Sequence, residues 1–254
     1  MAIETFLPVH FPTRQLIERY LGRGKNIHQF MDIAGGSAQT FIWRDEFVGD
    51  TVNATYRVMG TGTPTQSIIT DTVNGMATLT TTAVSGDSSG LSLGLHCQGQ
   101  LYPVLIARVK SETITTQKIE VGFSDSHSND GFVNNMATPT FTGSNGAVWI
   151  MDRNTDANWH IRSAAAGVTG ANTNPAIALV AETYAYVVVA LEDGNARFYL
   201  ADANGFVVHD SGWKTSAITK TTSVTPWLYT QTRAASARTL DIDLLWVWQR
   251  RTTA

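Results

Sequence analysis

The sequence predicts an all-β protein, a sandwich of two antiparallel sheets. Two observations support this prediction, and the first is the residue pattern of the last strand. In the segment 239–250, TLDIDLLWVWQR, apolar residues occupy every second position: Leu240, Ile242, Leu244, Trp246 and Trp248. This spacing is typical of one apolar strand face. Leu245 and Val247 make the second half of the opposite face apolar as well. We therefore expect a strand that is buried on both sides, as in a sandwich.

The second observation is a series of turn signals between β-forming runs. Asn74-Gly75, Asp193-Gly194 and Asn204-Gly205 each stand between such runs, and these dipeptides favour tight hairpin turns. Together with further expected strands, these signals give a turn roughly every 8 to 12 residues, which is typical of sandwiches. Further strands are expected at Leu91–Leu95, Val104–Lys110, Lys118–Phe123, Ala147–Asp152 and Ser223–Tyr229.

Residues 1–40 differ from the rest, and we expect them to form an anchoring arm in front of one sandwich domain at 41–254. Thr13 can cap a short helix that runs through Leu21, with Gly22 placed to end it. The glycine-containing segments 22–25 and 35–37 are interpreted as flexible joints. A helix of about two turns is not stable alone, so it must dock on something. The apolar residues expected at a contact with neighbouring subunits are Phe6, Phe11, Leu16, Ile17, Tyr20 and Leu21. The alternative is that the arm folds back on its own sandwich.

The composition excludes several classes of partner. Only 15% of the 254 residues are charged, against about 25% in an average domain. A formal net charge of -3 gives no electrostatic reason to bind nucleic acid or an anionic membrane. No apolar run approaches the roughly 18 residues of a membrane span. The single cysteine, Cys97, is expected to be a small buried thiol.

Three stretches resemble strands of the concanavalin A-like jelly rolls, the family that includes laminin-G-like domains and glucanases. They are IWRDEFVGD at 42–50, LEDGNARFYLADANGFVV at 191–208 and DIDLLWVWQ at 241–249. The resemblance implies that the first and last strands pair in one sheet. A narrower resemblance, in the segments 107–128 and 146–163, is to sandwich modules of tailed-bacteriophage virion proteins. It implies a viral structural protein.

The catalytic pattern of the family's hydrolases is missing. Glucanases of this fold carry Glu-x-Asp-x-(x)-Glu on one strand, so that the carboxylates reach one cleft. In the comparable segment, 118–125, Glu120 and Asp125 are five positions apart and point to opposite faces, whereas a retaining pair lies roughly 5 to 5.5 Å apart. Asp241 and Asp243 share a face but are expected to be solvated. No serine-nucleophile, phosphate-loop or zinc-protease motif occurs. We expect neither an enzyme nor a cofactor.

Two weaker candidates for ligand binding remain. The loop around Asp125, His127, Asn129 and Asp130 carries enough oxygen ligands to hold Ca²⁺, although a polar turn is the preferred interpretation, so no metal is expected. Sugar recognition would need an exposed aromatic side chain. The candidates are Trp149, Trp159, Trp213 and Trp227, and Trp159 is the preferred candidate among them. Trp149 lies between Val148 and Ile150 and is expected in the core.

The leading hypothesis is therefore a non-enzymatic virion protein of a tailed bacteriophage, assembled in the host cytoplasm and located in the virion. We expect it to decorate or cement the capsid as a homotrimer, docking on the major capsid protein through its arm. The alternative is a carbohydrate-binding module of a tail fibre or receptor-binding protein, which would bind a surface glycan. A glycoside hydrolase is the third hypothesis.

Overall fold

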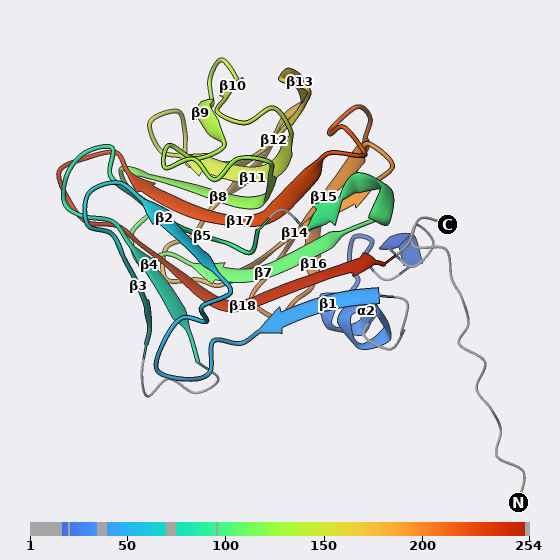
Figure 1. The fold of residues 1–254 in the computed structure, drawn as a ribbon, viewed down its shortest axis with the longest axis horizontal. Coiled ribbons are helices and arrows are strands. Elements are labelled where there is room, and N and C mark those ends of the chain that lie inside the picture. The colour runs from blue at the N-terminus through green and yellow to red at the C-terminus, as the bar shows by residue number, and fades with distance from the viewer. Residues whose placement is uncertain (1–16, 20, 35–39, 70–74, 95, 252–254) are drawn as a thin grey trace, which may run out of the picture.

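The structure is a computed structural model that describes residues 17–19, 21–34, 40–69, 75–94 and 96–251. Two antiparallel sheets pack face to face (Figure 1), which confirms the predicted two-sheet sandwich. The first sheet runs in the order β16 (Val207–Lys214), β15 (Asn195–Ala201), β14 (Ala185–Glu192), β7 (Val104–Lys110), β18 (Thr239–Arg250), β4 (Ala77–Thr80), β3 (Thr65–Ile68), with β1 (Thr40–Asp45) paired to β18. The helix α2 (Ile27–Ala34) lies on the outer face of this first sheet, so we call the first sheet the helix-covered sheet.

The second sheet runs in the order β13 (Val168–Ala178), β12 (Asn158–Ala165), β11 (Gly146–Asp152), β8 (Gln117–Ser124), β17 (Ser223–Thr232), β5 (Ser88–Ser92), β2 (Arg57–Gly60), with β6 (Cys97–Gln98) paired to β17. Its outer face lies under residues 125–145, which include the short hairpin of β9 (Val133–Asn135) and β10 (Thr140–Phe141) (Figure 1). We call this stretch the plug segment and the sheet the plug-covered sheet. A 3-10 turn, η1 (Gly99–Leu101), precedes β7.

The core between the sheets is built from alternate residues of the central strands. Val121 of β8 and Val189 of β14 belong to the same buried cluster, as period-two alternation requires. Trp149 and Trp159 also lie in this cluster and meet edge to face with 6.2 Å between ring centroids. The prediction that Trp149 is a core residue is confirmed.

The opening and closing strands pair antiparallel, from Thr40 opposite Arg250 to Asp45 opposite Leu245, as the family resemblance implied. The prediction of one continuous apolar face on β18 is wrong, because the register against β7 shifts between Ile242 and Leu244. An extra residue in a bulge inverts the facing of every residue after it. The residues that face the core between the sheets are Leu240, Ile242, Leu245 and Val247, whereas Leu244, Trp246 and Trp248 face outward.

The outward-facing residues of β18 are covered by the chain's own N-terminal region. Ile17, Leu21 and Phe30 are fully buried in one cluster with Trp246 and Trp248. The prediction that Ile17 and Leu21 contact neighbouring subunits is therefore wrong, and the alternative of an arm folded on its own sandwich holds for these residues. Phe6, Phe11, Leu16 and Tyr20 lie outside the described residues.

The helical part of this region differs from the prediction. Residues 17–19 are helical, but Leu21 is not, and the helix α2 was not predicted. The side chain of Asn26 accepts a hydrogen bond from the His28 N–H (2.9 Å), which satisfies a free donor at the start of α2. The segment 22–25 is no flexible joint, because the Gly24 N–H donates to the Val207 carbonyl and the Val207 N–H donates to the Lys25 carbonyl (both 2.9 Å). These bonds hold the segment against the edge of β16.

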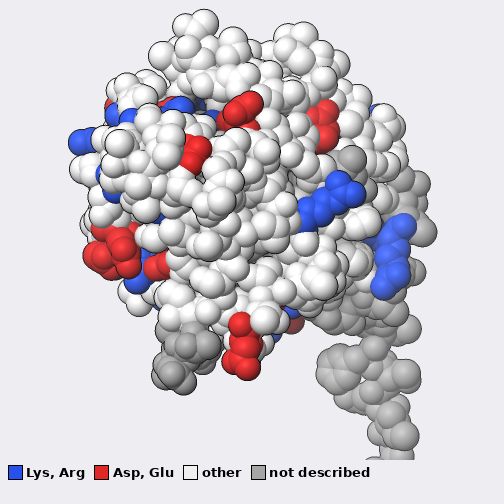
Figure 2. All heavy atoms as spheres, turned by 60° about the vertical axis from the view of Figure 1, so that its left-hand side comes forward, with Lys and Arg blue, Asp and Glu red and all other residues white. Residues whose placement is uncertain are grey.

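The predicted strands and turns are mostly in place. β7 has the predicted bounds, whereas the strand expected at Leu91–Leu95 lies at Ser88–Ser92, where it pairs with both β17 and β2. Asp193-Gly194 forms a two-residue turn with positive φ at both positions, as an Asp-Gly hairpin requires. No helix among the described residues is long and apolar enough to span a membrane. Figure 2 shows charged side chains scattered over a mainly uncharged face, in keeping with the composition.

Candidate functional site

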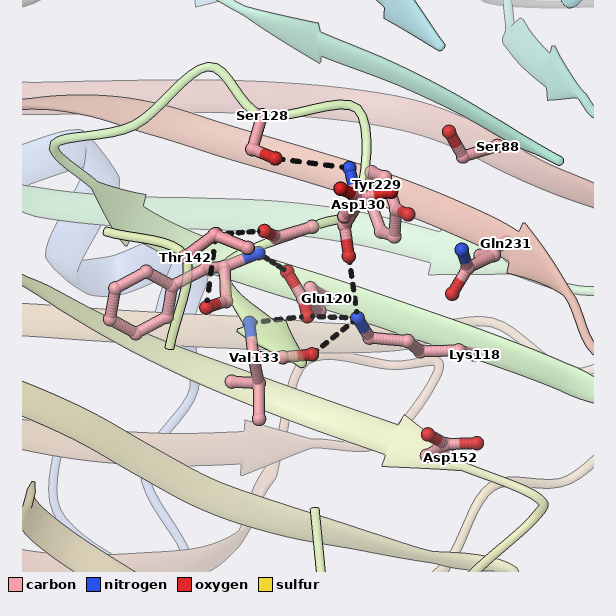
Figure 3. Close-up of polar contacts among 12 residues, drawn as sticks. Ser88, Lys118, Glu120, Ser128, Asp130, Val133, Thr142, Asp152, Tyr229 and Gln231 are labelled. Atoms are coloured by element: carbon pink, nitrogen blue, oxygen red, sulfur yellow. Dashed lines mark hydrogen bonds and ion pairs between the residues drawn. The ribbon is translucent and has the colours of Figure 1, made fainter. Parts of the chain in front are cut away.

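The outer face of the plug-covered sheet is the candidate site, because β8 contains the segment 118–124, which the family resemblance compared with the carboxylate strand of glucanases. Ile119 and Val121 of β8 point into the core between the sheets. The alternate residues Lys118 and Glu120 therefore point outward, where an uncovered sheet would expose them to solvent. They are 1% and 0% exposed instead, because the plug segment lies across them (Figure 3).

The Glu120 carboxylate accepts four hydrogen bonds. One comes from Lys118 Nζ (2.8 Å) on the same strand and one from Trp227 Nε1 (2.8 Å) on β17. The plug segment supplies the other two, from the N–H groups of Phe132 (2.6 Å) and Val133 (2.9 Å). A buried carboxylate needs partners of this kind to offset its lost hydration. Glu120 is therefore saturated with donors.

Lys118 and its neighbours bind the plug segment through main-chain oxygens. Lys118 Nζ donates to the carbonyls of Asp130 (3.1 Å) and Val133 (2.5 Å). The Tyr229 hydroxyl, from β17, donates to the Asn129 carbonyl (2.9 Å), and Ser88 Oγ, from β5, donates to the same carbonyl (2.5 Å). The sheet thus recognises the backbone of the segment, and these contacts link β5, β8 and β17 to it. Figure 3 shows the contacts that come from Lys118 of β8.

Apolar packing closes the rest of this face. Trp227 and Tyr229 are stacked with their ring centroids 5.6 Å apart, and both are fully buried in one cluster with Phe132. Phe132 in turn packs against Phe141, with 5.0 Å between ring centroids. The aromatic surfaces that could serve as a sugar platform on this face are therefore covered by the chain itself.

Gly131 is the point where the plug segment comes closest to the ion pair. Its φ of +83° is strained for any side chain, and an added Cβ would lie 2.7 Å from Lys118 Nζ and 2.9 Å from Glu120 Oε1. We expect Gly131→Ala to lower the free energy of unfolding by about 2–4 kcal/mol, since backbone strain adds to overpacking. Urea unfolding measures this loss.

Gly167→Ala is the matched control, because Gly167 has a similar φ of +79° with nothing within 4 Å of the added Cβ. Only the left-handed backbone penalty of about 1–2 kcal/mol should remain there. Equal losses at Gly131 and Gly167 would contradict close packing over the ion pair.

The carboxylates considered as catalytic pairs are all engaged in other contacts. Asp125 follows the end of β8, and its Oδ2 accepts a hydrogen bond from the Asn145 N–H (2.8 Å). The prediction that Asp241 is solvated is wrong. It is 3% exposed and accepts a hydrogen bond from Thr78 Oγ1 (2.7 Å), while Asp243 pairs with Arg108 (2.7 Å).

The four residues of the candidate calcium loop lie in the plug segment, but their side chains do not meet at one point. His127 Nδ1 lies 2.8 Å from Ser92 Oγ, Asn129 Oδ1 accepts a hydrogen bond from the Gly60 N–H (3.0 Å), and Asp130 is exposed. Within the described part of the chain, no three His, Cys, Asp or Glu side chains are grouped closely enough to hold a metal ion. The loop residues fasten the plug segment to β5 and β2 instead.

The prediction that Trp159 is exposed is wrong. It is 0% exposed and packs in the core between the sheets beside Trp149, so it offers no platform for a glycan. Lys118 is the residue of this site that sequence reasoning missed. The available signal was a Lys-x-Glu pair on one face of a strand whose other face is apolar, which places two opposite charges side by side.

A second buried polar cluster lies on β12 at the same face. His160 Nε2 contacts both oxygens of Asp156 (3.0 and 2.9 Å), and Arg162 donates to His160 Nδ1 (3.1 Å) and to the Met136 carbonyl (2.9 Å). Burial alone would raise the pKa of Asp156, but the Asn158 N–H and His160 hold it below its usual value. This cluster fastens the C-terminal half of the plug segment.

Two half-buried histidines make stability depend on pH. Burial lowers the pKa of His127, with Arg57 adding to the shift, and burial also lowers the pKa of His209. The unfolded chain, with histidine pKa values near 6.5, then binds more protons than the folded chain. At higher pH the free energy of unfolding should therefore not depend on these two histidines. It should fall as the pH drops through about 6.5, their pKa in the unfolded chain, toward their lowered pKa values in the folded chain.

Urea midpoints measured between pH 7.5 and pH 5 check this expectation. The double variant His127→Asn, His209→Asn should show a shallower decline than the parent chain. A decline of unchanged steepness in the double variant would assign the pH dependence to other groups.

No protein-family model and no curated protein matches this chain. Several solved structures match this chain in fold. A protein of unknown function, SO2946 from Shewanella oneidensis MR-1, superposes with a TM-score of 0.62 at 13% identity, over 86% of this chain and 90% of that one. Peanut lectin, solved with a 9mer peptide, gives a TM-score of 0.58 at 11% identity, over 85% and 100%. A Bacillus licheniformis β-glucanase gives 0.51 at 12% identity, over 83% and 98%.

The chain has the concanavalin A-like jelly-roll fold. Lectins and glucanases share this jelly roll, and at these identities the likeness extends to the fold alone. In the part of the chain that the structure describes, the outer face of this jelly roll's second sheet is closed by the plug segment fastened over β8.

Proposed function

We propose that this protein is a non-enzymatic structural protein of a tailed-bacteriophage particle, a capsid decoration or cement protein that docks on the major capsid protein through its N-terminal residues. The observation that carries the proposal is the closed outer face of the plug-covered sheet. Glu120 is the carboxylate on the strand comparable to the glucanases' catalytic strand, and it is neutralised by Lys118 and covered by Phe132 and Val133. A carboxylate in this state is unsuited to attack a sugar.

The anchoring part of the proposal now falls on residues 1–16. The described residues 17–19 and 21–34 dock on the helix-covered sheet through Ile17, Leu21 and Phe30. Phe6 and Phe11 are the two phenylalanines that precede this docked region. Large aromatic side chains are the type that dominates binding energy at protein interfaces. The low charge of the sandwich surface (Figure 2) suits a module displayed on a particle without attracting ions or nucleic acid.

Deletion of residues 1–16 tests this function. Particles are prepared from the phage whose genome encodes this chain, with the gene deleted, and purified protein is added back. We expect the full chain to bind at saturating occupancy and the truncated chain to remain folded, by circular dichroism, but not to bind. Light scattering tests the homotrimer expected from the same hypothesis. Full-occupancy binding by the truncated chain, or absence of the protein from wild-type particles, would overturn the proposal.

Glycan recognition is the second candidate, favoured by the fold shared with peanut lectin. A binding face would then lie outside the covered area of the plug-covered sheet. A glycan array probed with the full chain tests it: saturable binding to any glycan supports this function, and an array without hits removes it.

A further inference from the structure

An apolar pocket opens between the two sheets beside β1. Its volume is about 290 Å³, and a cavity of about 150 Å³ is enough to hold one benzene ring. Thr55 and His96 line it and are exposed, so they mark its opening. The other lining residues are uncharged and mainly apolar: Phe41, Trp43, Leu93, Cys97, Pro226 and Val247. The pocket therefore fits a large uncharged side chain, because nothing in its lining would offset the desolvation of a charge.

The pocket wall formed by Trp43 is held in position. Its Nε1 donates to the Tyr56 hydroxyl (3.0 Å), and the two rings meet edge to face with 5.9 Å between centroids. A wall that is already fixed loses little conformational entropy when the pocket is filled.

The edge of β1 next to this pocket is open to a further strand. Within the part of the chain that the structure describes, β1 pairs with β18 alone and lies at a border of the helix-covered sheet (Figure 1). No main-chain hydrogen bond joins residues 41–45 to a described segment other than β18. Such an edge is a template for an added strand, whose main chain gives affinity and whose alternate side chains give specificity. Since Phe41 and Trp43 alternate on the face of β1 that lines the pocket, an added strand would direct every second side chain toward it.

The segment 7–11, LPVHF, which lies outside the described residues, has the sequence of such a strand. Leu7, Val9 and Phe11 occupy alternate positions, which places them on one face of an extended chain. Pro8 favours extended backbone in the residue before it, and a proline is tolerated in a strand that forms the edge of a sheet. The segment contains no Asp, Glu, Lys or Arg, which matches the uncharged pocket.

The distance along the chain directs Phe11 to the pocket of another copy rather than to its own. Phe11 precedes Ile17 by six residues, which span at most about 22 Å. The region around Ile17 is docked near β15, because Glu18 lies 3.7 Å from Arg197. From β15, the sheet order passes β14, β7 and β18 before it reaches β1. With the passage round β1 to the inner face, this path is roughly 30 Å long, which exceeds the reach of the segment.

We propose that residues 7–11 of a neighbouring copy add a strand to the free edge of β1 and place Phe11 in the pocket. Each copy gives its segment to one neighbour and receives a segment from another, and a head-to-tail contact of this kind closes into a ring when the rotation allows. The inference deepens the proposed function, because it rests on the homotrimer expected there and assigns the contact between its copies. Residues 1–6 take no part in this contact and remain for the capsid protein.

Light scattering of the purified chain tests the contact without particles. We expect a trimer for the parent chain and for Phe6→Ala. Phe11→Ala should raise the dissociation constant of the trimer by about 30-fold or more, the effect of losing one dominant interface side chain. Phe6→Ala is the matched control, since it removes the same kind of side chain outside the segment. A monomeric parent chain, or a trimer of equal affinity in Phe11→Ala, would overturn the inference.

A blocked pocket gives the reciprocal test. Thr55 is exposed, so Thr55→Trp should fill the opening while the chain stays folded, and it should weaken the trimer as Phe11→Ala does. A mixture of the two variants combines an intact segment with an intact pocket and should contain a 1:1 complex. Absence of that complex at millimolar concentration, or a trimer unaffected by Thr55→Trp, would also overturn the inference.

Cys97 identifies the copy that fills the pocket, because it is the only cysteine of the chain and lines the pocket. Oxidation of Phe11→Cys at millimolar concentration should link position 11 to Cys97 of another copy and give covalent oligomers on a denaturing gel. Phe6→Cys is the control and should give at least about tenfold less of the disulfide with Cys97, as the reach of one residue position requires. A disulfide within one chain, or equal yields from both variants, would overturn the inference and leave the particle function standing. Full-occupancy particle binding by the chain without residues 1–16 would overturn the particle function instead.

Discussion

Replacing Glu120 by Gln is expected to lower the free energy of unfolding by about 3–5 kcal/mol, the usual cost of leaving a buried charge without its partner. Lys118 would remain 1% exposed with only uncharged acceptors, the carbonyls of Asp130 and Val133 and at most one amide oxygen. The new NH₂ would replace one carboxylate oxygen and would then face N–H groups that now donate to it, either those of Phe132 and Trp227 or that of Val133 together with Lys118 Nζ. Urea unfolding measures the loss, and proteolysis within residues 125–145 should accelerate.

The reverse change is expected to cost less. In Lys118→Met, Glu120 keeps the N–H donors of Phe132, Val133 and Trp227, so we expect a loss of about 1–3 kcal/mol. Glu182→Gln is the matched surface control, because Glu182 is 63% exposed and lies 3.7 Å from Lys110. It should change stability by less than about 0.5 kcal/mol. A loss in Glu120→Gln no larger than in this control would show that the ion pair does not hold the plug segment.

Replacing Phe30 by Ala is expected to cost about 3–5 kcal/mol, the range for a fully buried phenylalanine. The Phe30 ring meets Trp246 and Trp248 edge to face, with 5.8 and 6.5 Å between centroids. Without it, α2 would lose its main contact and both tryptophans of β18 would become accessible to water. Urea unfolding gives the energy, and a red shift of tryptophan emission reports the exposure.

Gln29→Ala controls for helix propensity, since Gln29 is exposed on the same helix and alanine is the better helix former. It should leave both stability and emission unchanged. If Phe30→Ala behaves like Gln29→Ala, residues 27–34 contribute nothing to the sandwich, and deletion of the whole region before β1 would be tolerated.

Strand positions were predictable because each depends on nearby residues. The alternation of Ile119, Val121 and Phe123 fixes β8 and its core face, and Asp193-Gly194 fixes the turn between β14 and β15. The family resemblance added the pairing of first and last strands. In the N-terminal region the helix α2 was missed, since its stability comes from packing on β18 rather than from its own sequence.

The candidate site was less predictable for the same physical reason. Alternation shows that Lys118 and Glu120 share the outer face of β8, and on that basis they would be solvated. Their burial depends on Gly131, Phe132 and Val133, which return over the strand from the loop that follows it. The exposure of Trp159 was misjudged because its surrounding residues, DANWHIRS, are polar, while its burial depends on Trp149 and the opposite sheet.

By itself, the sequence therefore determined the all-β class, most strands and, on β8, the side that faces the core. Only the tertiary structure decided what covers the second face. On β18 a bulge next to Asp243 moves Trp246 and Trp248 outward, and α2 then covers them. On β8 the plug segment covers Glu120. The period of apolar residues reports the local geometry of one strand. The cover of its second face is a different segment, and the sequence of that segment does not show which strand it packs on.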